Sequence, residues 1–242
     1  MKLLCNILKT TWLLFWAAMA TIVLFVPMTL AALCSRTGNL AFTISQWWAW
    51  TVRLAAFVRV DITGKENIQK GQSYVIISNH QSLFDIIALV TTLGIQFRWI
   101  IKQELLRVPL FGYALYAARN IFIDRSNSER ARESIKKGVD RLPKGVSILF
   151  FAEGTRQMPG TLGQFKKGGF MVALQNHLPV LPVTVNGSAK VLPRKSVVFS
   201  PGSIKVVAGK PINTESYDRQ HLEELMKDTR SVVGSQMKWH EG

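Results

Sequence analysis

Hydrophobic and polar positions divide this chain into two parts with different patterns. Residues 10–35 contain no charged side chain, a run of 26 positions, and about 20 apolar residues suffice to cross a bilayer. A second weakly polar segment covers 39–58, with Arg53 inside it and Arg59 directly after it. Beyond about residue 56 the apolar runs become short and alternate with polar stretches. The pattern predicts an N-terminal membrane element followed by a folded body.

The short runs of the body have the length and composition of alternating strands and helices. The strand-like runs are rich in β-branched or aromatic residues and are bounded by Gly, Asn, Lys or Pro. The predicted strands are 58–63, 74–78, 97–101, 121–124, 146–151, 180–185 and 204–208. The predicted helices are 83–93, 110–119, 128–141, 165–176 and 215–238. This alternation favours an α/β sandwich around a mostly parallel sheet. We therefore expect a membrane-associated two-helix segment at 1–57 and a folded domain at 58–242.

The first apolar run is predicted to be a retained anchor. A cleaved signal peptide is the alternative, but its apolar region is usually about 7–15 residues, which is shorter than this run. Tryptophans gather at bilayer interfaces, and five of the seven in this chain lie in the first 50 residues. They are Trp12, Trp16, Trp47, Trp48 and Trp50. The second segment, with its arginines, is typical of an interfacial helix. Whether the first helix spans the bilayer or the pair enters one leaflet stays open.

Composition and charge narrow the classes of function. A hydrophobic fraction of 48% excludes a disordered chain, and two cysteines exclude a cysteine-rich metal site. The first 52 residues carry three basic and no acidic side chains, so the remainder has a net charge of +12. A basic body suits nucleic acid or an anionic membrane surface. The apolar leader and the absence of a nucleic-acid recognition motif favour the membrane.

A histidine and an aspartate follow the second predicted strand. His80 lies in the turn after that strand, at the sheet edge where open α/β sheets usually bind ligands. Asp85 comes one helical turn later and can reach back to the imidazole. A carboxylate that binds one ring nitrogen leaves the other free to act as a base. For an isolated pair, a structural histidine that caps a turn is the commoner explanation.

Two arginines follow other strands at the same predicted edge. Arg125 comes after the strand at 121–124, and Arg156 comes after the strand at 146–151. A guanidinium matches the oxygens of a phosphate, although a lone arginine is more often a surface ion-pair partner. Glu153, in the same turn as Arg156, has oxygens that can accept hydrogen bonds from a polyol. The run 178–183 is predicted to be a buried strand between prolines.

The sequence offers no protein nucleophile to accompany His80. It has no Gly-x-Ser-x-Gly elbow, and both cysteines, Cys5 and Cys34, lie in the apolar leader. The histidines are not paired at the helical spacing of a metal site. The chemistry that remains is general-base activation of a substrate hydroxyl, with direct transfer of a group to it.

Taken together, these clusters resemble the four ordered motifs of the glycerolipid acyltransferases. The motifs are Asn79-His80-x4-Asp85, Phe122-Ile123-Asp124-Arg125, Phe151-Ala152-Glu153-Gly154-Thr155-Arg156 and Leu178-Pro179-Val180-Leu181-Pro182-Val183. The likeness covers about residues 58–210 and is strongest to the bacterial 1-acyl-sn-glycerol-3-phosphate acyltransferases. Two positions depart from the family pattern. Ala152 replaces a usual proline, which predicts a looser turn, and Asn120 replaces a usual glycine.

The resemblance implies a role for each motif residue. His80 would be the general base that deprotonates the sn-2 hydroxyl of lysophosphatidic acid, and Asp85 would orient and stabilise it. The residues implied in substrate binding are Arg125 and Arg156 for the phosphate, Glu153, Gly154 and Thr155 for the glycerol phosphate pocket, and Lys102 as a further cation. The run 179–183 would line the pocket or the acyl site.

The implied reaction makes phosphatidic acid from an acyl thioester and lysophosphatidic acid. The co-substrate is acyl-CoA or an acyl carrier protein, with no cofactor and no metal ion. The implied partners are these substrates and anionic membrane lipids, and nucleic acid is not among them. The expected location is the cytoplasmic face of a bacterial inner membrane. Two alternatives stay open: a related acyltransferase that acts on glycerol 3-phosphate or another lysolipid, and a non-catalytic lipid-binding protein.

Overall fold

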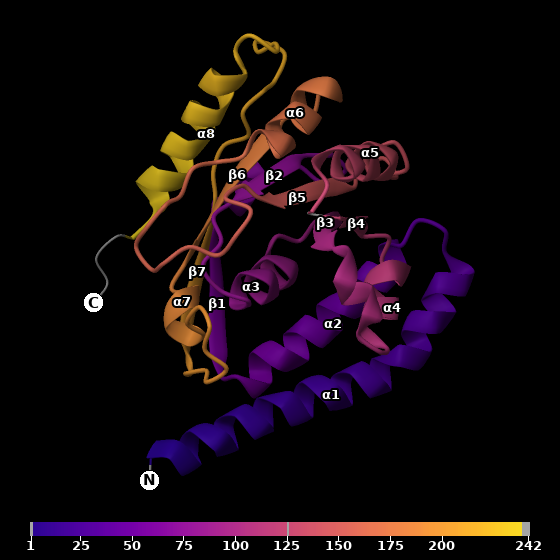
Figure 1. Ribbon diagram of the computed structural model, residues 1–242, viewed down its shortest axis with the longest axis vertical. Helices are drawn as coiled ribbons and strands as arrows, with labels where there is room; N and C mark the ends of the chain where they lie inside the picture. Colours follow the sequence, from indigo (N-terminus) through magenta and orange to yellow (C-terminus); the bar gives the residue numbers. More distant parts are fainter. Residues whose placement is uncertain (1, 125, 239–242) are drawn as a thin grey trace.

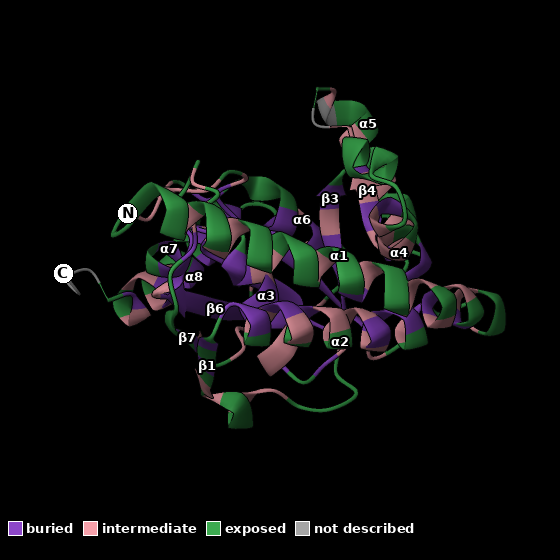
Figure 2. Cartoon of the chain, turned by 90° about the horizontal axis from the view of Figure 1, so that it is seen from below, coloured by how far each residue is buried: buried purple, intermediate pink, exposed green. Residues whose placement is uncertain are grey.

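The chain begins with two long helices that lie against each other. The computed structural model describes residues 2–124 and 126–238. Helix α1 (Lys2–Cys34) and helix α2 (Asn39–Ala55) are joined by a short turn and run side by side (Figures 1 and 2). Within the described residues, α1 is the one helix long and apolar enough to cross a membrane. Both helices lie where the two weakly polar segments predicted them.

In residues 2–124 and 126–238, seven strands form one sheet in the order β1-β7-β6-β2-β5-β3-β4. The pair β6 and β7 is antiparallel and the other neighbouring pairs are parallel, which confirms the mostly parallel sheet. The strands are β1 (Val58–Thr63), β2 (Val75–Ser78), β3 (Phe97–Lys102), β4 (Ile121–Ile123), β5 (Ser147–Phe151), β6 (Val180–Asn186) and β7 (Gly202–Ala208). The central strands β2 and β6 are buried along their whole length, as parallel strands covered on both faces are.

Helices cover both faces of the sheet and give it a three-layer arrangement (Figure 1). The remaining helices are η1 (Lys65–Asn67), α3 (Phe84–Thr92), η2 (Gln103–Arg107), α4 (Phe111–Ala117), α5 (Ser128–Val139), α6 (Lys167–Gln175), α7 (Ser188–Val191) and α8 (Leu222–Gln236). One hydrophobic core joins α2, α3 and α7 to the sheet. A second core joins α5, α6 and α8 to the opposite face. The division of domains at residue 57 stays a prediction, and α2 shares the first core with the sheet.

The C-terminal helix begins later than the sequence pattern predicts. Its first residue is Leu222, whereas the pattern predicted a start at residue 215. The Asp218 carboxylate accepts the backbone N–H groups of Gln220 and His221 at 2.7 and 3.1 Å. This local bonding holds the chain in a turn before the helix, since an aspartate side chain competes with helical backbone bonds. The short helices η1, η2 and α7 were not predicted.

A buried arginine ties the helix pair to the sheet. Arg98, near the start of β3, is fully buried and donates to the Thr37 carbonyl at 3.0 Å and to Asn39 Oδ1 at 2.6 Å. Its guanidinium also lies 5.5 Å from the ring centre of Phe42 on α2. Burial lowers the pKa of Arg98 to about 10, so the side chain is still charged at neutral pH. The buried Arg98 therefore helps to fix the turn between α1 and α2 to the sheet, together with Gln96, whose side chain donates to the Asn39 carbonyl at 3.3 Å.

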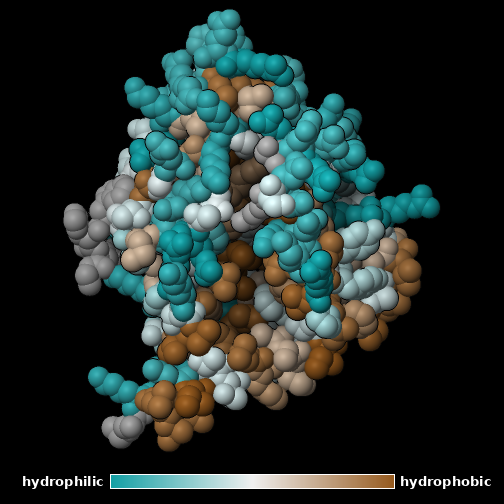
Figure 3. Space-filling model, in the orientation of Figure 1, coloured by the Kyte–Doolittle hydropathy of each residue, from teal (hydrophilic) through white to brown (hydrophobic). Residues whose placement is uncertain are grey.

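The outer side of the helix pair is strongly apolar. Figure 2 shows α1 exposed along most of its length, and Figure 3 shows hydrophobic side chains gathered where Figure 1 places α1 and α4. The large exposed apolar residues of η2 and α4 continue this surface next to α1. They are Leu105, Leu106, Val108, Leu110, Tyr113 and Tyr116. An exposed apolar surface of this extent marks an interaction with a membrane or another protein.

Candidate active site

The register of the parallel strands brings the predicted site residues to one edge of the sheet. Ser78, at the end of β2, pairs with Phe151 at the end of β5, and Lys102 at the end of β3 pairs with Ile123 at the end of β4. The segments that follow these strands therefore leave from the same edge. His80, Asp124 and the Glu153–Arg156 turn lie in these segments. Arg125 also follows β4 but lies outside the described residues.

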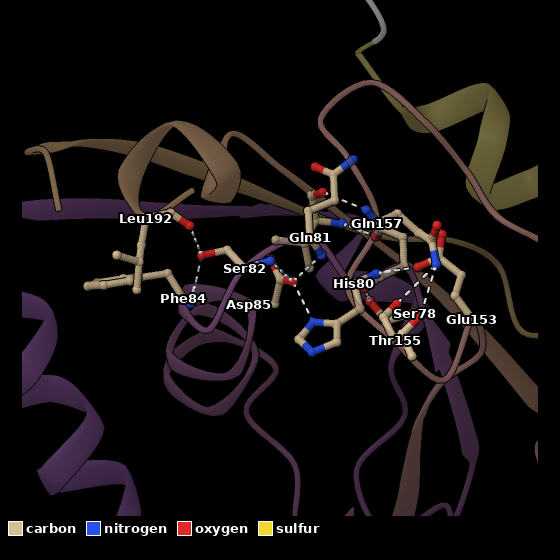
Figure 4. Close-up of polar contacts among 12 residues, drawn as sticks. Ser78, His80, Gln81, Ser82, Phe84, Asp85, Glu153, Thr155, Gln157 and Leu192 are labelled. Carbon is tan, nitrogen blue, oxygen red and sulfur yellow. Dashed lines mark hydrogen bonds and ion pairs between the residues drawn. The ribbon is translucent and has the colours of Figure 1, made fainter. Parts of the chain in front are cut away.

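His80 and Asp85 meet as expected. His80 Nδ1 lies 2.8 Å from Asp85 Oδ2, and the second ring nitrogen points away from the carboxylate (Figure 4). The same Oδ2 accepts the backbone N–H groups of Gln81 and Ser82 at 2.7 and 2.9 Å. Because this oxygen acts as an acceptor, the ring proton belongs on Nδ1. Nε2 is left with its lone pair and has no hydrogen-bond partner among the described residues.

The two side chains differ in exposure in the way an acid–base pair requires. The Asp85 side chain is 0% exposed, whereas that of His80 is 14% exposed. Asp85 is in the first turn of α3, and Ser82 connects that turn to the chain beyond β6, since its hydroxyl donates to the Leu192 carbonyl at 2.8 Å. The carboxylate is thus held inside the protein while the edge of the imidazole reaches solvent.

Aromatic stacking fixes the plane of the imidazole. The His80 ring lies parallel to the Phe151 ring, with 3.7 Å between their centres and 10° between their planes. Phe151 stacks in turn on Trp99 of β3, with ring centres 5.6 Å apart. The sequence motif marked Phe151 only as the end of a strand. Its role as a platform for the histidine depends on the pairing of β2 with β5.

Backbone contacts hold the turn that carries His80. Asn79 exchanges two hydrogen bonds with Val185 of β6: its Nδ2 donates to the Val185 carbonyl, and its Oδ1 accepts the Val185 N–H. The run 179–183 was predicted to line the pocket or the acyl site. It lies in the loop entering β6 and in the buried part of that strand, and its role in lining the pocket or the acyl site stays a prediction. β6 therefore contributes to the site by anchoring Asn79.

Glu153 supports the same turn from the other side. One carboxylate oxygen accepts the His80 N–H at 2.8 Å, and the other accepts the Gly163 N–H at 2.9 Å. Glu153 is 3% exposed, and burial raises its pKa, although the two N–H donors counteract part of the rise. The contacts of Glu153 are those of a residue that positions His80. Direct contact with a polyol, as the sequence suggested, stays a prediction.

The loop that contains Gly163 is fastened by the C-terminal helix. Arg230 of α8 donates to the carbonyls of Leu162 and Gly163 at 2.9 and 3.3 Å. Gln157, at the start of this loop, donates its N–H to the His80 carbonyl at 2.8 Å. A continuous chain of hydrogen bonds therefore connects α8 to the catalytic turn. No sequence motif marked Arg230, which lies 150 residues after His80.

Cationic and hydroxyl groups lie in the segments that leave the same edge of the sheet as the His80 turn. Arg156 is half-buried and forms no hydrogen bond or ion pair with any described residue. Thr155 accepts two hydrogen bonds from the side chain of Gln157, at its carbonyl and at its hydroxyl (Figure 4). Lys102 is half-exposed and pairs with Glu104 at 3.0 Å. Arg156 is thus open to a ligand, whereas Lys102 already has a carboxylate partner.

The two departures from the family pattern both form hydrogen bonds. The Ala152 N–H donates to the Ser78 carbonyl at 3.1 Å, a bond that a proline in its place cannot make. This bond ties the turn to β2, so the expectation of a looser turn was wrong. Asn120 Oδ1 accepts the Trp99 N–H at 2.9 Å, and its Nδ2 donates to the Leu115 carbonyl. Asn120 thereby joins the end of α4 to β3.

An apolar cavity of about 90 Å³ opens between the helix pair and the site. Helices α1 to α4 form its walls together with Trp99, which stacks on the same Phe151 that supports His80. Its other lining residues are apolar apart from Thr21 and Ser45. No sequence pattern predicted this cavity, because its walls come from five elements that are distant along the chain. Among the described residues, no group of three or more His, Cys, Asp or Glu side chains is placed to hold a metal ion.

Known proteins are similar to this chain in sequence and in fold. A family model described as Acyltransferase matches residues 59–186. A 1-acyl-sn-glycerol-3-phosphate acyltransferase of Pseudomonas aeruginosa is 34% identical over 81% of this chain and 77% of its own length. A chloroplast protein of the same description from Arabidopsis thaliana is 33% identical over 80% of this chain, which spans only about half (53%) of that relative. A chloroplast relative from Brassica napus is likewise matched over 49% of its length.

The fold agrees with a solved structure over nearly the whole chain. The crystal structure of the 1-acyl-sn-glycerophosphate acyltransferase from Thermotoga maritima superposes with a TM-score of 0.84 at 25% sequence identity. The match covers 97% of this chain and 95% of that one, so it includes the N-terminal helix pair as well as the sheet. With a family model matched across the motif-bearing strands and this fold in common, the chain belongs to the acyltransferase family.

Proposed function

We propose that this protein transfers a fatty acyl group from an acyl thioester to the sn-2 hydroxyl of lysophosphatidic acid and so forms phosphatidic acid. The observation that carries the proposal is the His80–Asp85 pair, whose free Nε2 lies at the sheet edge where Arg156 has no partner among the described residues. A base next to an open cation suits an alcohol that bears a phosphate. The relatives from Pseudomonas and Arabidopsis, which carry the name of this reaction, support the same conclusion.

The reaction proceeds by direct transfer. His80 Nε2 takes the proton of the acceptor hydroxyl while the oxygen attacks the thioester carbonyl and forms a tetrahedral oxyanion. Collapse of this intermediate breaks the carbon–sulfur bond, and the leaving thiolate receives the proton from His80. Asp85 stabilises the imidazolium between the two steps. No acyl-enzyme forms, because His80 acts only as a base and no activated serine or cysteine accompanies it.

Arg156 holds the acceptor phosphate in this proposal, together with Arg125. Gly154 and Thr155 form the wall of the glycerol phosphate pocket, and Lys102 adds positive charge once it leaves Glu104. Glu153 acts through the backbone of His80. The resemblance to the family motifs supports these roles, and each is tested by the acceptor KM of the corresponding variant.

The apolar cavity between α1, α2, α3 and α4 receives a short part of the acyl chain, because its volume of about 90 Å³ has room for only a few methylene groups. Trp99 lines the cavity and belongs to the ring stack under His80, so a chain in the cavity has its thioester end near the base. The donor is acyl-CoA or an acyl carrier protein. The exposed apolar side of α1 seats the enzyme in the membrane, next to anionic lipids, at the cytoplasmic face of a bacterial inner membrane.

An acceptor panel with the purified full-length protein tests the proposal. Lysophosphatidic acid, glycerol 3-phosphate and a zwitterionic lysophospholipid are each offered with acyl-CoA and with acyl carrier protein, and the products are identified by mass spectrometry. The proposal predicts that phosphatidic acid from lysophosphatidic acid is the main product. Preferential acylation of glycerol 3-phosphate or of the other lysolipid would show a related acyltransferase instead. Lipid binding without any transfer would show a non-catalytic protein and overturn the proposal.

A further inference from the structure

Two neighbouring lysines at the start of α6 have different surroundings. Lys166 directly precedes the helix, and Lys167 is its first residue. In the sequence they look like equivalent surface cations. The Lys167 ammonium lies 2.6 Å from Glu223 Oε1 on α8, whereas the side chain of Lys166 lies against Gly154. The structure therefore directs one of them to an outer helix and the other to the catalytic turn.

Gly154 provides the space in which Lys166 lies. A Cβ at this position would be 2.9 Å from both Cε and Nζ of Lys166 and 3.0 Å from its Cδ. Gly154 has a φ of +71°, a conformation that glycine adopts without strain. The Lys166 N–H donates to the Ala152 carbonyl at 2.7 Å, which anchors the residue beside the Glu153–Arg156 turn. The backbone of Lys166 is thus anchored, and its exposed side chain lies over Gly154 in the turn that carries Arg156.

The start of α6 is itself fixed to the carboxyl edge of the sheet. A Cβ at Gly169, in the first turn of this helix, would approach Ile77 of β2 to 2.8 Å and Phe150 of β5 to 3.0 Å. The helix therefore meets the last residues of the two strands that lead to His80 and to Glu153. No side chain caps its first turn, so the positive end of the helix dipole adds to the field at this edge.

The charge of Lys166 is not compensated within the described part of the chain. Its ammonium forms no ion pair there, in contrast to Lys102 and Lys167, which pair with Glu104 and Glu223. Glu153, the acid of the adjacent turn, is engaged with the backbone N–H groups of His80 and Gly163. An unpaired ammonium fixed beside a catalytic turn is suited to bind an anionic group of a ligand.

We propose that Lys166 binds the phosphate of the acyl acceptor and makes the enzyme select acceptors that carry a phosphomonoester. The inference rests on the proposed function. A phosphomonoester has a charge of about −1.5 to −2 at neutral pH and three terminal oxygens that accept hydrogen bonds, so it can bind cations from several elements at once, Lys166 as well as the arginines. Lys166 supplies a further positive charge from a different element, and it reaches the turn only because residue 154 is a glycine.

The test compares Lys166→Met with the matched control Lys167→Met in the full-length enzyme. KM and kcat are measured for lysophosphatidic acid at saturating donor, and KM for the donor at saturating acceptor. Lys166→Met is expected to raise the acceptor KM by about 10-fold, the lower end of the effect of losing a hydrogen bond to a charged group, because the side chain is exposed to solvent. The donor KM should not change, and Lys167→Met should match the wild type. Lys166→Arg should restore most of the acceptor affinity.

A phosphate-free acceptor supplies a second readout. Any slow acylation of monoacylglycerol should be equal in wild type and Lys166→Met, so the preference for lysophosphatidic acid falls by the factor lost in kcat/KM. An unchanged acceptor KM would overturn the inference, and so would a rise confined to the donor KM, which would place the ammonium on the phosphates of the donor. Equal losses in the two lysine variants would show a general charge effect and overturn it as well. If the wild type does not acylate lysophosphatidic acid at all, the proposed function itself has failed.

Discussion

At the scale of single residues, the orientation of one imidazole depends on contacts from several distant segments. Asp85 fixes its proton, Phe151 fixes its plane, and Glu153 and Gln157 hold its backbone. Each contact restricts a different motion of His80. A base held in this way loses little conformational entropy when it meets the acceptor hydroxyl. The precision of the site therefore comes from residues that never touch the substrate.

The charge of Asp85 is predicted to act on turnover alone. Asp85→Asn keeps the shape of the side chain and an oxygen for the N–H groups, but it removes the anion that stabilises the imidazolium. We expect kcat to fall by a factor on the order of 10²–10⁴, the usual contribution of general-base catalysis, with the acceptor KM within a few-fold of wild type. Steady-state kinetics measures both. Asp61→Asn, on the exposed side of β1, is the matched control, and equal kinetics in the two variants would contradict the role of Asp85.

The raised pKa of Glu153 predicts a pH-dependent contribution to stability. The buried carboxyl keeps its proton to a higher pH than the same group in the unfolded chain, whose pKa is near 4.5. Its stabilising contribution is therefore complete below that value and declines as the pH rises toward the folded pKa. Glu153→Gln lacks this titration. The melting temperature of wild type minus that of the variant should thus decrease with rising pH over this window and then level off. A difference that grows with pH would contradict the assignment.

The sequence singled out His80, Asp85, Glu153 and Arg156 but not the other contacts that hold the imidazole. His80, Asp85 and Arg156 are recognisable because their chemistry is unusual after a strand. Phe151 and Asn79 belong to the recognised motifs, yet their contacts depend on which strands pair. Arg230 has no such signal, because an exposed arginine on an outer helix looks the same whether or not it binds a distant loop.

At the scale of elements, the strands were easier to predict than the turns between them. Strand positions follow from short apolar runs, because such runs between polar turns are typical of buried parallel strands. β6 was predicted despite Pro182, and the structure shows why the strand tolerates this proline. The Pro182 carbonyl accepts the Gly209 N–H just beyond the end of β7, so the N–H that proline lacks would face a point where the β6–β7 ladder has already ended. The start of α8 was missed because Asp218 offers the backbone a local alternative to the helix.

The contact of α8 with the loop at 157–163 is predicted to affect catalysis. Arg230→Gln removes the charged donor at the Leu162 and Gly163 carbonyls. It thereby loosens the loop whose Gly163 N–H donates to the Glu153 carboxylate. We expect kcat to fall by about 3- to 10-fold, because hydrogen bonds from a charged donor are lost at a partly exposed site. The melting temperature should change little. Lys227→Gln, on the exposed side of the same helix, is the control.

Combining the change at Arg230 with one at Glu153 separates a positioning role from a general one. If the two residues act through the same chain of contacts, the loss in the double variant Arg230→Gln/Glu153→Gln should be smaller than the product of the single losses. Strictly multiplicative losses, or wild-type kinetics in Arg230→Gln, would contradict the connection between α8 and His80.

At the scale of the whole molecule, the helix pair and the sheet form one unit. α2 shares a hydrophobic core with the sheet, and Arg98 bonds the turn between α1 and α2. The apolar cavity lies at this junction, so α1 and α2 form a wall of the proposed acyl site. The charge-free run at 10–35 and the weakly polar segment at 39–58 predicted the two helices. Their position against the sheet could not be read from these segments, because Arg98 resembles any other charged residue in a strand.

Loss of Arg98 is predicted to release the turn between the two helices. Arg98→Met leaves the Thr37 carbonyl and the Asn39 side chain without their donor, and we expect a loss of about 2–4 kcal/mol in the free energy of unfolding. Trypsin should then cleave faster after Arg36, which lies in this turn. Thermal unfolding and timed proteolysis measure the two effects. Arg59→Met, exposed on β1, is the control, and equal cleavage rates in the two variants would contradict the role of Arg98.

The central claim is that His80 activates the acceptor hydroxyl for direct transfer, and acceptor-dependent thiol release tests it most directly. Free thiol is followed with an acyl thioester in the presence and absence of lysophosphatidic acid, for wild type, His80→Ala and the control His221→Ala. Direct transfer predicts no release without acceptor, one thiol per phosphatidic acid with it, and a loss of about 10³-fold or more in His80→Ala alone. A burst of about one thiol per enzyme before acceptor is added, or turnover that survives without His80, would contradict the mechanism.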